Sequence, residues 1–174
     1  MQTNRAMISV LAGDRVGLVA DITGCLNDMG LNLGDASFAV LGASAKFTAI
    51  SEVPEEVSLG QLEWALRGVD GLTNATLSVT PYGGEGHGPQ GRVTHRIILV
   101  GGDRPGLVAR LCEVLVQYQA NIVTLTAQSL PGAEGGTYAV RFEVNLPAER
   151  AQTCLATMAN TASELRMTCD MEAV

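Results

Sequence analysis

The octapeptide GDRVGLVA at residues 13–20 returns as GDRPGLVA at residues 102–109. At this offset of 89 residues, compared without gaps, nine of the twenty positions from Gly13 to Asn32 are identical. Ordinary composition predicts about one or two such identities. The last one pairs Asn32 with Asn121, well beyond the octapeptide itself. The chain is therefore a tandem duplication of one small unit.

The segment between the copies, PYGGEGHGPQG at residues 81–91, has the composition of a linker. Its five glycines and two prolines do not favour a regular element. We therefore expect a first domain over residues 1–81, a Gly/Pro-rich linker over 82–91 and a second domain over 92–174. His87 falls in this linker, where a solvated histidine is expected.

Each copy shows the same succession of hydrophobic patterns. Apolar or alternating runs predict strands, and stripes at the 3.6-residue period predict helices. Copy one has strands at 6–11, 34–41, 46–53 and 75–80 and helices near 18–29 and 58–69; copy two has strands at 93–100, 123–127, 138–145 and 165–171 and helices near 107–118 and 148–163. The order βαββαβ is the ferredoxin-like arrangement. The predicted class is α+β, with two four-stranded antiparallel sheets, each carrying both helices on one face.

The octapeptide opens the first helix of each copy. Asp14 and Asp103 are expected to cap these helices, because a carboxylate accepts hydrogen bonds from the free N–H groups of a first turn. Pro105 is expected within the first turn, where no N–H partner is lost. The turns that follow these helices are expected to differ, because Gly30-Leu31 is replaced by Gln119-Ala120.

Charge and hydropathy exclude some classes of function. The net charge is −7 and no run of basic residues occurs, whereas proteins that bind a phosphate backbone carry a surplus of Lys and Arg. We expect no direct binding to nucleic acid and none to an anionic membrane. No stretch approaches the ~20 apolar residues of a membrane span, and residues 1–12 lack the pattern of a secretory leader. A cytoplasmic protein is expected.

Catalytic and metal chemistry find little support in the sequence. The four cysteines at positions 25, 112, 154 and 169 lie apart from one another and from both histidines, so we expect buried, reduced thiols and no metal or other cofactor. His95 begins a strand and is expected on its exposed face, so no histidine is placed to activate a nucleophile. The phosphate-binding pattern GxxxxGK[ST] is absent. The chain is not expected to be an enzyme.

In this context the octapeptide resembles the ACT-domain family. A first strand that ends in GDRPGLV, an amphipathic helix and an entry into the second strand at Asn121-Ile122 are what ACT domains look like. Copy one has Val16 in place of the usual proline and enters its second strand at Asn32-Leu33. Residues 35–42 with 47–48, and residues 136–138 with 144–148, are similar to the glycine cleavage system transcriptional repressor family.

The resemblance implies a regulator that binds a free amino acid between paired domains, glycine or serine being the candidates. Lacking a DNA-binding element, it would act on glycine cleavage genes through a protein partner such as a transcription activator. Because small sheets leave edges to pair, the two copies are expected to pack on one another within the chain or across a homodimer, and a homo-oligomer is expected. The ligand-binding residues are expected to be Asp14, Arg15, Val16, Gly17, Leu18 and Asn32 in copy one, and Asp103, Arg104, Pro105, Gly106, Leu107 and Asn121 in copy two.

The chemistry of these residues suits an amino acid. Free N–H groups and the helix dipole favour a carboxylate, and an asparagine amide offers both a donor and an acceptor. Copy one is preferred for the ligand and copy two, with its longer loop at 131–136, for protein contacts. We also keep the interpretations in which the aspartates are only caps, the arginines are solvated and the asparagines serve a left-handed turn.

Two alternatives remain for the whole protein. One is a scaffold that acts by pairing without any ligand. The other is an acylphosphatase-like hydrolase, since that family shares the ferredoxin-like order and uses an arginine and an asparagine. The chain lacks that family's Gly-x-Val-x-Gly-Val run into the helix.

Overall fold

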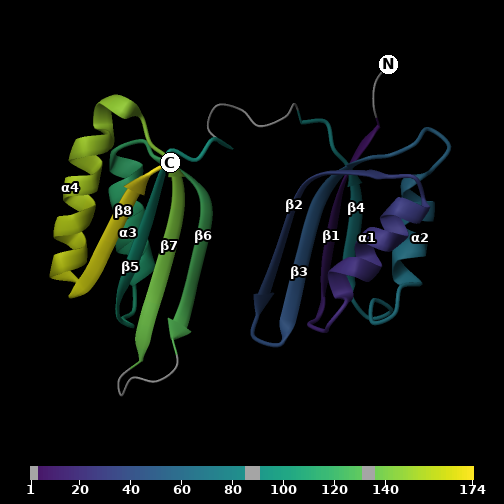
Figure 1. Ribbon diagram of the computed structural model, residues 1–174, viewed down its shortest axis with the longest axis horizontal. Coiled ribbons are helices and arrows are strands. Elements are labelled where there is room, and N and C mark those ends of the chain that lie inside the picture. Colours follow the sequence, from purple (N-terminus) through teal and green to yellow (C-terminus); the bar gives the residue numbers. More distant parts are fainter. Residues whose placement is uncertain (1–3, 85–90, 131–135) are drawn as a thin grey trace. The chain divides into compact units, whose positions relative to one another are not determined.

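The computed structural model describes residues 4–84, 91–130 and 136–174, and the chain divides into two compact units, Met1–Gly84 and Glu85–Val174 (Figure 1). Unit 1 contains β1 (Arg5–Gly13), α1 (Leu18–Asp28), β2 (Asn32–Leu41), β3 (Ser44–Glu52), α2 (Leu59–Arg67) and β4 (Thr76–Pro81). Unit 2 contains β5 (His95–Gly102), α3 (Leu107–Gln117), β6 (Asn121–Leu130), β7 (Thr137–Asn145), α4 (Ala148–Glu164) and β8 (Met167–Ala173). Most of the expected linker, His87 included, and residues 131–135 of the expected long loop lie outside the described residues.

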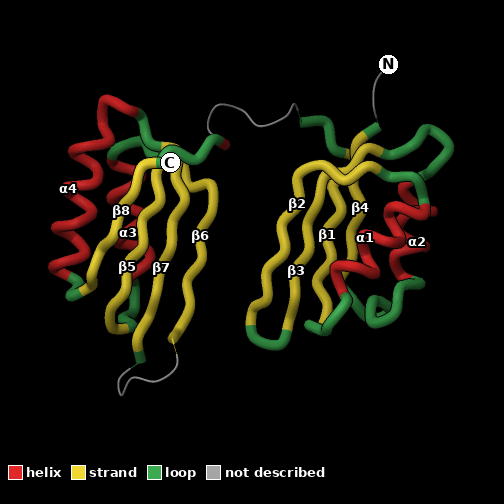
Figure 2. Tube along the Cα trace, viewed as in Figure 1, coloured by secondary structure: helices red, strands yellow, loops and turns green. Residues whose placement is uncertain are grey.

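Both units have the same topology. The strand orders are β2-β3-β1-β4 and β6-β7-β5-β8, and every neighbouring pair is antiparallel. In each unit the two helices lie on the same face of the sheet (Figure 2). The predicted ferredoxin-like α+β fold is confirmed.

Alternation of buried and exposed side chains along the inner strands builds the two cores. In unit 1, Ile8, Val10 and Phe47 turn toward the helices and pack with Ile22 and Leu66. In unit 2 the corresponding layer consists of Ile97, Leu99, Phe142, Leu111 and Met158. Among the described residues, the other face of each sheet carries no helix of its own unit, so that each unit covers its own strands on one side only.

One of the two edge strands of unit 1, β2, is exposed along its whole length. Phe38 and Val40 of β2 lie opposite Phe47 and Ala45 of β3, and therefore on the helix side of the sheet. They nevertheless remain 42% and 45% exposed. An open edge with apolar side chains is a surface that proteins commonly use for pairing.

The position of His95 differs from the prediction. It precedes Ile97 by two residues on β5 and so shares the core side of the strand rather than the exposed face. It is half-buried, and its Nδ1 lies 3.0 Å from the hydroxyl of Thr94.

No helix in the described part of the chain is long and apolar enough to cross a membrane.

Candidate ligand site

The glycine loop before each first helix is a type II turn. The N–H of Leu18 donates to the carbonyl of Arg15 at 3.3 Å, and that of Leu107 donates to the carbonyl of Arg104 at 3.2 Å. The third residues of these turns, Gly17 and Gly106, have φ values of 85° and 79°, the left-handed conformation that a type II turn needs at this position. A side chain there would be strained, which explains why both copies carry glycine.

The aspartate caps predicted at these helices are wrong. Gly17 and Gly106 are themselves the N-cap residues, and no side chain caps either helix. Because the turn lies between the aspartate and the helix, Asp14 and Asp103 fall three residues before the cap. Their N–H groups instead donate to the carbonyls of Ala43 and Gly136, at 2.9 Å and 3.4 Å.

Pro105 was predicted within the first turn of the helix, but it lies two residues before the first helical residue, Leu107. It occupies the second position of the type II turn, before the helix rather than within it, and this is a position that a fixed proline φ suits well. Val16 holds the equivalent position in unit 1 with its side chain fully exposed.

The two leucines of the expected site point away from any ligand. Leu18 and Leu107 are each only 2% exposed and belong to the cores. The N–H groups of the two residues after each leucine do remain available to a ligand, because they have no acceptor among the described residues. They belong to Val19 and Ala20 in α1 and to Val108 and Ala109 in α3. Sequence reasoning missed these four residues because it took Asp14 and Asp103 as the caps and therefore looked for the free N–H groups within the octapeptide's turn, before Leu18 and Leu107.

Arg15 is held within unit 1 by its two terminal nitrogens, while its Nε is buried without a hydrogen-bond partner. Its Nη2 donates to Asp21 Oδ2 at 2.7 Å and to the carbonyl of Asp70 at 2.6 Å, and its Nη1 donates to the carbonyl of Val16 at 3.2 Å. Its Nε packs against Gly71, where an added Cβ would lie 2.9 Å away. Arg15 therefore ties the glycine loop to α1 and to the segment between α2 and β4.

Arg104, the equivalent arginine of unit 2, has no such partners. It is exposed and forms no ion pair or side-chain hydrogen bond with any described residue. The position equivalent to Asp21 holds Arg110, which pairs with Glu164 at 3.4 Å. The same loop thus presents a committed guanidinium in unit 1 and an available one in unit 2.

The two asparagines lie at the opposite end of their units from the glycine loops. Asn121 follows the C-terminus of α3, and the 11 residues of that helix put it roughly 16 Å from the turn that contains Arg104. In unit 1, Asn32 lies opposite Glu52, which also pairs with Arg5 at the start of β1, whereas the loop follows the end of β1. A loop and an asparagine of the same unit therefore cannot hold one small ligand.

The turns that lead into the asparagines are alike, contrary to expectation. Gly30 and Gln119 both adopt a left-handed φ, 77° and 57°, and the N–H groups of Leu31 and Ala120 close the same helix-ending bond, to Leu26 and Leu115. The left-handed residue is not the asparagine in either turn, so the interpretation of Asn32 and Asn121 as left-handed turn residues is wrong.

A hollow of about 510 Å³ adjoins Asn121. It is lined by Val116, Gln119, Ala120, Asn121, Asn145 and Pro147. Asn145 lies directly opposite Asn121 on β7. The polar end of unit 2 thus has amide groups beside an open depression.

The described residues contain no cluster of three or more His, Cys, Asp or Glu side chains arranged to hold a metal ion. Cys154 is buried and the other three cysteines are half-buried. Burial raises the pKa of all four thiols, and nearby Asp28 and Asp170 raise the pKa of Cys25 and Cys169 further. Thiols with raised pKa values are poor nucleophiles at neutral pH.

Residues 97–172, nearly all of unit 2, match the family model described as ACT domain. The whole chain is similar in structure to an unknown protein from Galdieria sulphuraria, with 22% identity, a TM-score of 0.80 and 98% of each chain covered. It is also similar to a structure described as a putative glycine cleavage system transcriptional repressor, with 12% identity, a TM-score of 0.70 and coverage of 100% of this chain and 99% of the other.

No curated protein matches the chain. At these identities the two structural likenesses establish the fold, and the family model adds the sequence pattern of unit 2. Unit 1 repeats that fold together with the octapeptide. The chain is therefore a tandem of two units with one fold, of which unit 2 matches the ACT-domain model.

Proposed function

We propose that this chain is a regulatory protein that binds a free amino acid at the glycine loop of unit 2 and acts through protein contacts rather than catalysis. The observation that carries the proposal is the available guanidinium of Arg104 beside the unpaired N–H groups of Val108 and Ala109. A cation and two N–H donors at the positive end of a helix suit a carboxylate.

An amino acid also needs a partner for its ammonium group, and the asparagine of the same unit is too far away. Antiparallel pairing of two β6 edges about a two-fold axis removes this difficulty. Leu130 lies opposite Thr137, which pairs with Gly102 just before the glycine turn, so β6 ends beside the loop. Such pairing brings the Asn121 end of a second copy next to that loop. The proposed site therefore requires a homo-oligomer.

Unit 2 replaces unit 1 as the preferred ligand site. In unit 1 the hydrogen bonds of Arg15 to Asp21 and Asp70 must break before its guanidinium could reach a ligand. We propose that unit 1 binds no ligand and acts only by pairing with other domains, as a scaffold would. Glycine and serine are the proposed ligands, in keeping with the fold shared with a putative glycine cleavage system transcriptional repressor.

The same separation of Arg104 and Asn121 argues against an acylphosphatase-like activity, in which an arginine and an asparagine of one domain would act together. For the regulatory role we propose an effect on glycine cleavage genes through a transcription activator. This is supported by the fold shared with the putative repressor and by the net charge of −7, which disfavours direct contact with DNA.

Calorimetric titration with each of the twenty amino acids tests the ligand proposal. Losing a charge-assisted hydrogen bond costs ~1.5–3 kcal/mol, so Arg104→Ala and Asn121→Ala should each weaken binding at least tenfold. Asn32→Ala is the matched control and should leave the affinity unchanged. Binding that survives both unit 2 substitutions would place the site elsewhere, and the absence of any binding at millimolar concentrations would favour the scaffold.

A further inference from the structure

A type II turn also forms the corner between α2 and β4 of unit 1. The N–H of Leu72 donates to the carbonyl of Val69 at 3.0 Å, and Gly71, the third residue of the turn, has a φ of 77°. Asp70 is the second residue, and both central residues are exposed. The turn therefore presents the peptide bond between Asp70 and Gly71 to solvent.

This peptide bond has an unusual chemistry. Asp70 and Gly71 form the one step in the sequence at which an aspartate or asparagine precedes a glycine. The backbone nitrogen after an aspartate is a nucleophile close to the side-chain carboxyl carbon, and glycine hinders its attack least because it has no Cβ. Neither the Asp70 carboxylate nor the N–H of Gly71 has a hydrogen-bond partner among the described residues. Both reacting groups are thus available.

The reaction that these two groups support is isomerisation of the aspartate. A bond forms between the nitrogen of Gly71 and Cγ of the protonated Asp70 carboxyl, the Cγ–OH bond breaks, and the hydroxyl group leaves as water with the proton of that nitrogen. One water then opens the cyclic imide that results. When this water adds to the main-chain carbonyl carbon, the chain continues through Cβ and Cγ as isoaspartate. The mass is unchanged, and neither an oxidant nor a cofactor is consumed.

The type II turn holds the reacting atoms apart. Ring closure requires the nitrogen of Gly71 and the Cγ of Asp70 to lie on the same side of the bond between Cα and the carbonyl carbon of Asp70. The second residue of a type II turn has ψ near about +120°, which for an L residue turns the following nitrogen away from Cβ. Asp70 must therefore rotate out of the turn before it reacts, and whatever holds the turn controls the rate.

Arg15 holds this turn in place from α1 and the glycine loop. Its Nη2 donates to the carbonyl of Asp70 at 2.6 Å. Its side chain also packs on Gly71, where an added Cβ would lie 2.9 Å from Nε. Rotation of Asp70 would turn its carbonyl away from the guanidinium and break this hydrogen bond. The clamp on unit 1 is thus also a restraint on the peptide bond that reacts.

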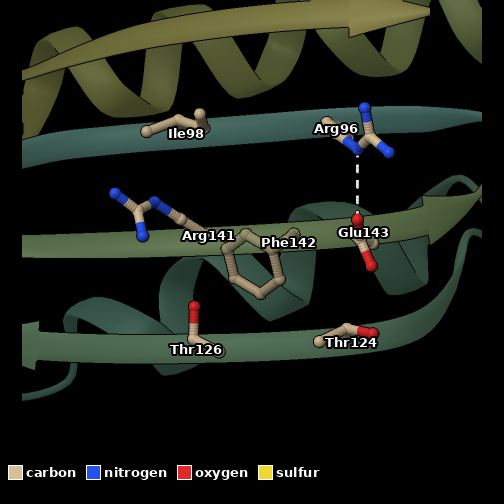
Figure 3. A pocket seen from close by; sticks show the side chains of 7 residues that line it. All are labelled: Arg96, Ile98, Thr124, Thr126, Arg141, Phe142 and Glu143. Atoms are coloured by element: carbon tan, nitrogen blue, oxygen red, sulfur yellow. Dashed lines mark hydrogen bonds and ion pairs between the residues drawn. The ribbon is translucent and has the colours of Figure 1, made fainter. Parts of the chain in front are cut away.

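Arg96 of unit 2 shows how an arginine can bind without such an effect. Its guanidinium donates to the carboxylates of Glu143 and Glu172 on the two neighbouring strands, at 3.1 Å and 3.0 Å, and Figure 3 shows the pair with Glu143. These bonds join side chains only and restrain no peptide unit directly. Arg15, by contrast, binds a main-chain carbonyl within a turn.

We propose that the bond between Asp70 and Gly71 is a site of isoaspartate formation and that Arg15 keeps it unreactive in the folded chain. Isoaspartate adds one carbon to the main chain and displaces the carbonyl that Arg15 binds. The modified turn cannot rebuild the clamp, so one event leaves unit 1 without it. The proposal does not depend on ligand binding at unit 2.

Ageing of the purified full chain at neutral pH and physiological temperature tests the proposal. Enzymatic methylation of isoaspartyl groups gives the rate of formation, and mass spectrometry of the tryptic peptide that begins at Gly68 locates the site. Arg15→Ala should form isoaspartate about tenfold faster or more than the native chain, because loss of a hydrogen bond to a charged group raises the population of the open turn by about this factor. Asp70→Glu, which keeps the main-chain carbonyl but needs a larger ring, should abolish the signal in both backgrounds.

Two control variants separate the clamp from general instability. Ile8→Val weakens the core of unit 1 and leaves the bond from Arg15 to Asp70 in place, and Arg104→Ala removes the equivalent arginine of unit 2. Both should form isoaspartate at the native rate. The proposal is overturned if the native chain or Ile8→Val reacts as fast as Arg15→Ala, or if no chain accumulates isoaspartate at position 70.

Discussion

Replacing Arg15 by alanine should destabilise unit 1, whereas the same change at Arg104 should not affect unit 2. Arg15 binds Asp21 and the carbonyl of Asp70, which lies 55 residues further along the chain. It therefore closes a long loop of unit 1. The side chain of Arg104 closes no such loop, since it forms no ion pair or hydrogen bond with any described residue.

The expected loss of stability on Arg15→Ala follows from how exposed Arg15 and its partners are. A hydrogen bond to a charged group contributes ~1.5–3 kcal/mol when it is shielded, and an exposed ion pair ~0.2–1 kcal/mol. The side chains of Arg15 and Asp21 are 30% and 48% exposed, so their pair belongs near the lower range. With about 1.5 kcal/mol for the bond to Asp70 and about 0.5 for the ion pair, the loss is about 2 kcal/mol.

Hydrogen exchange followed by mass spectrometry separates the two units, because each peptide belongs to one of them. A loss of about 2 kcal/mol should speed exchange of the unit 1 core roughly 30-fold and lower its melting temperature by roughly 8–16 °C. Exchange of the unit 2 core should stay unchanged. Arg104→Ala should change stability by less than about 0.5 kcal/mol. Equal effects of the two substitutions would refute the assignment of Arg15 as a clamp.

Three further predictions concern single sites. Gly71→Ala should destabilise unit 1 by more than ~1 kcal/mol in urea titration, because φ is 77° there and the new Cβ would lie 2.9 Å from Arg15 Nε; native stability would contradict this. Ser51→Ala should stabilise it by about 1 kcal/mol, since the hydroxyl is fully buried without a partner, and a loss of stability would show an unseen bond. Burial raises the pKa of Cys154, so the thiol of the folded chain should resist iodoacetamide at pH 7, and rapid alkylation would contradict this. The contribution of this thiol to the free energy of unfolding should decrease as the pH rises above the unfolded pKa of about 8.5, because only the unfolded state then loses the proton.

The sequence was sufficient for the fold because two kinds of pattern agreed. The duplication fixed the repeat, and the apolar periods gave each strand and helix to within about two or three residues. The duplication depends only on residue identity at a fixed offset, and the apolar periods depend only on which side chains need burial. The side of the strand on which His95 lies was mispredicted, although its parity with Ile97 was already visible.

The loops were harder to predict because competing local structures suit the same residues. The octapeptide contains an aspartate that can cap a helix and a glycine that can end a type II turn, and the turn is the structure formed. The bond from Arg15 to Asp70 has no sequence signal at all, because it joins residues that only the fold brings together. The separation of Asn121 from its loop was implied by the length of α3.

One helical position contributes to the contrast between the two arginines, beside the bond from Arg15 to the carbonyl of Asp70. In unit 1, Asp21 provides the carboxylate that holds Arg15 down on the loop. In unit 2 the same position carries Arg110, which cannot accept a hydrogen bond and is itself held by Glu164. Replacing an anion by a cation there both removes the partner of Arg104 and adds positive charge beside the free N–H groups of α3. A duplicated loop with closely similar backbone geometry is thereby a structural clamp in unit 1, and in unit 2 it leaves a guanidinium available for the carboxylate that we propose it binds.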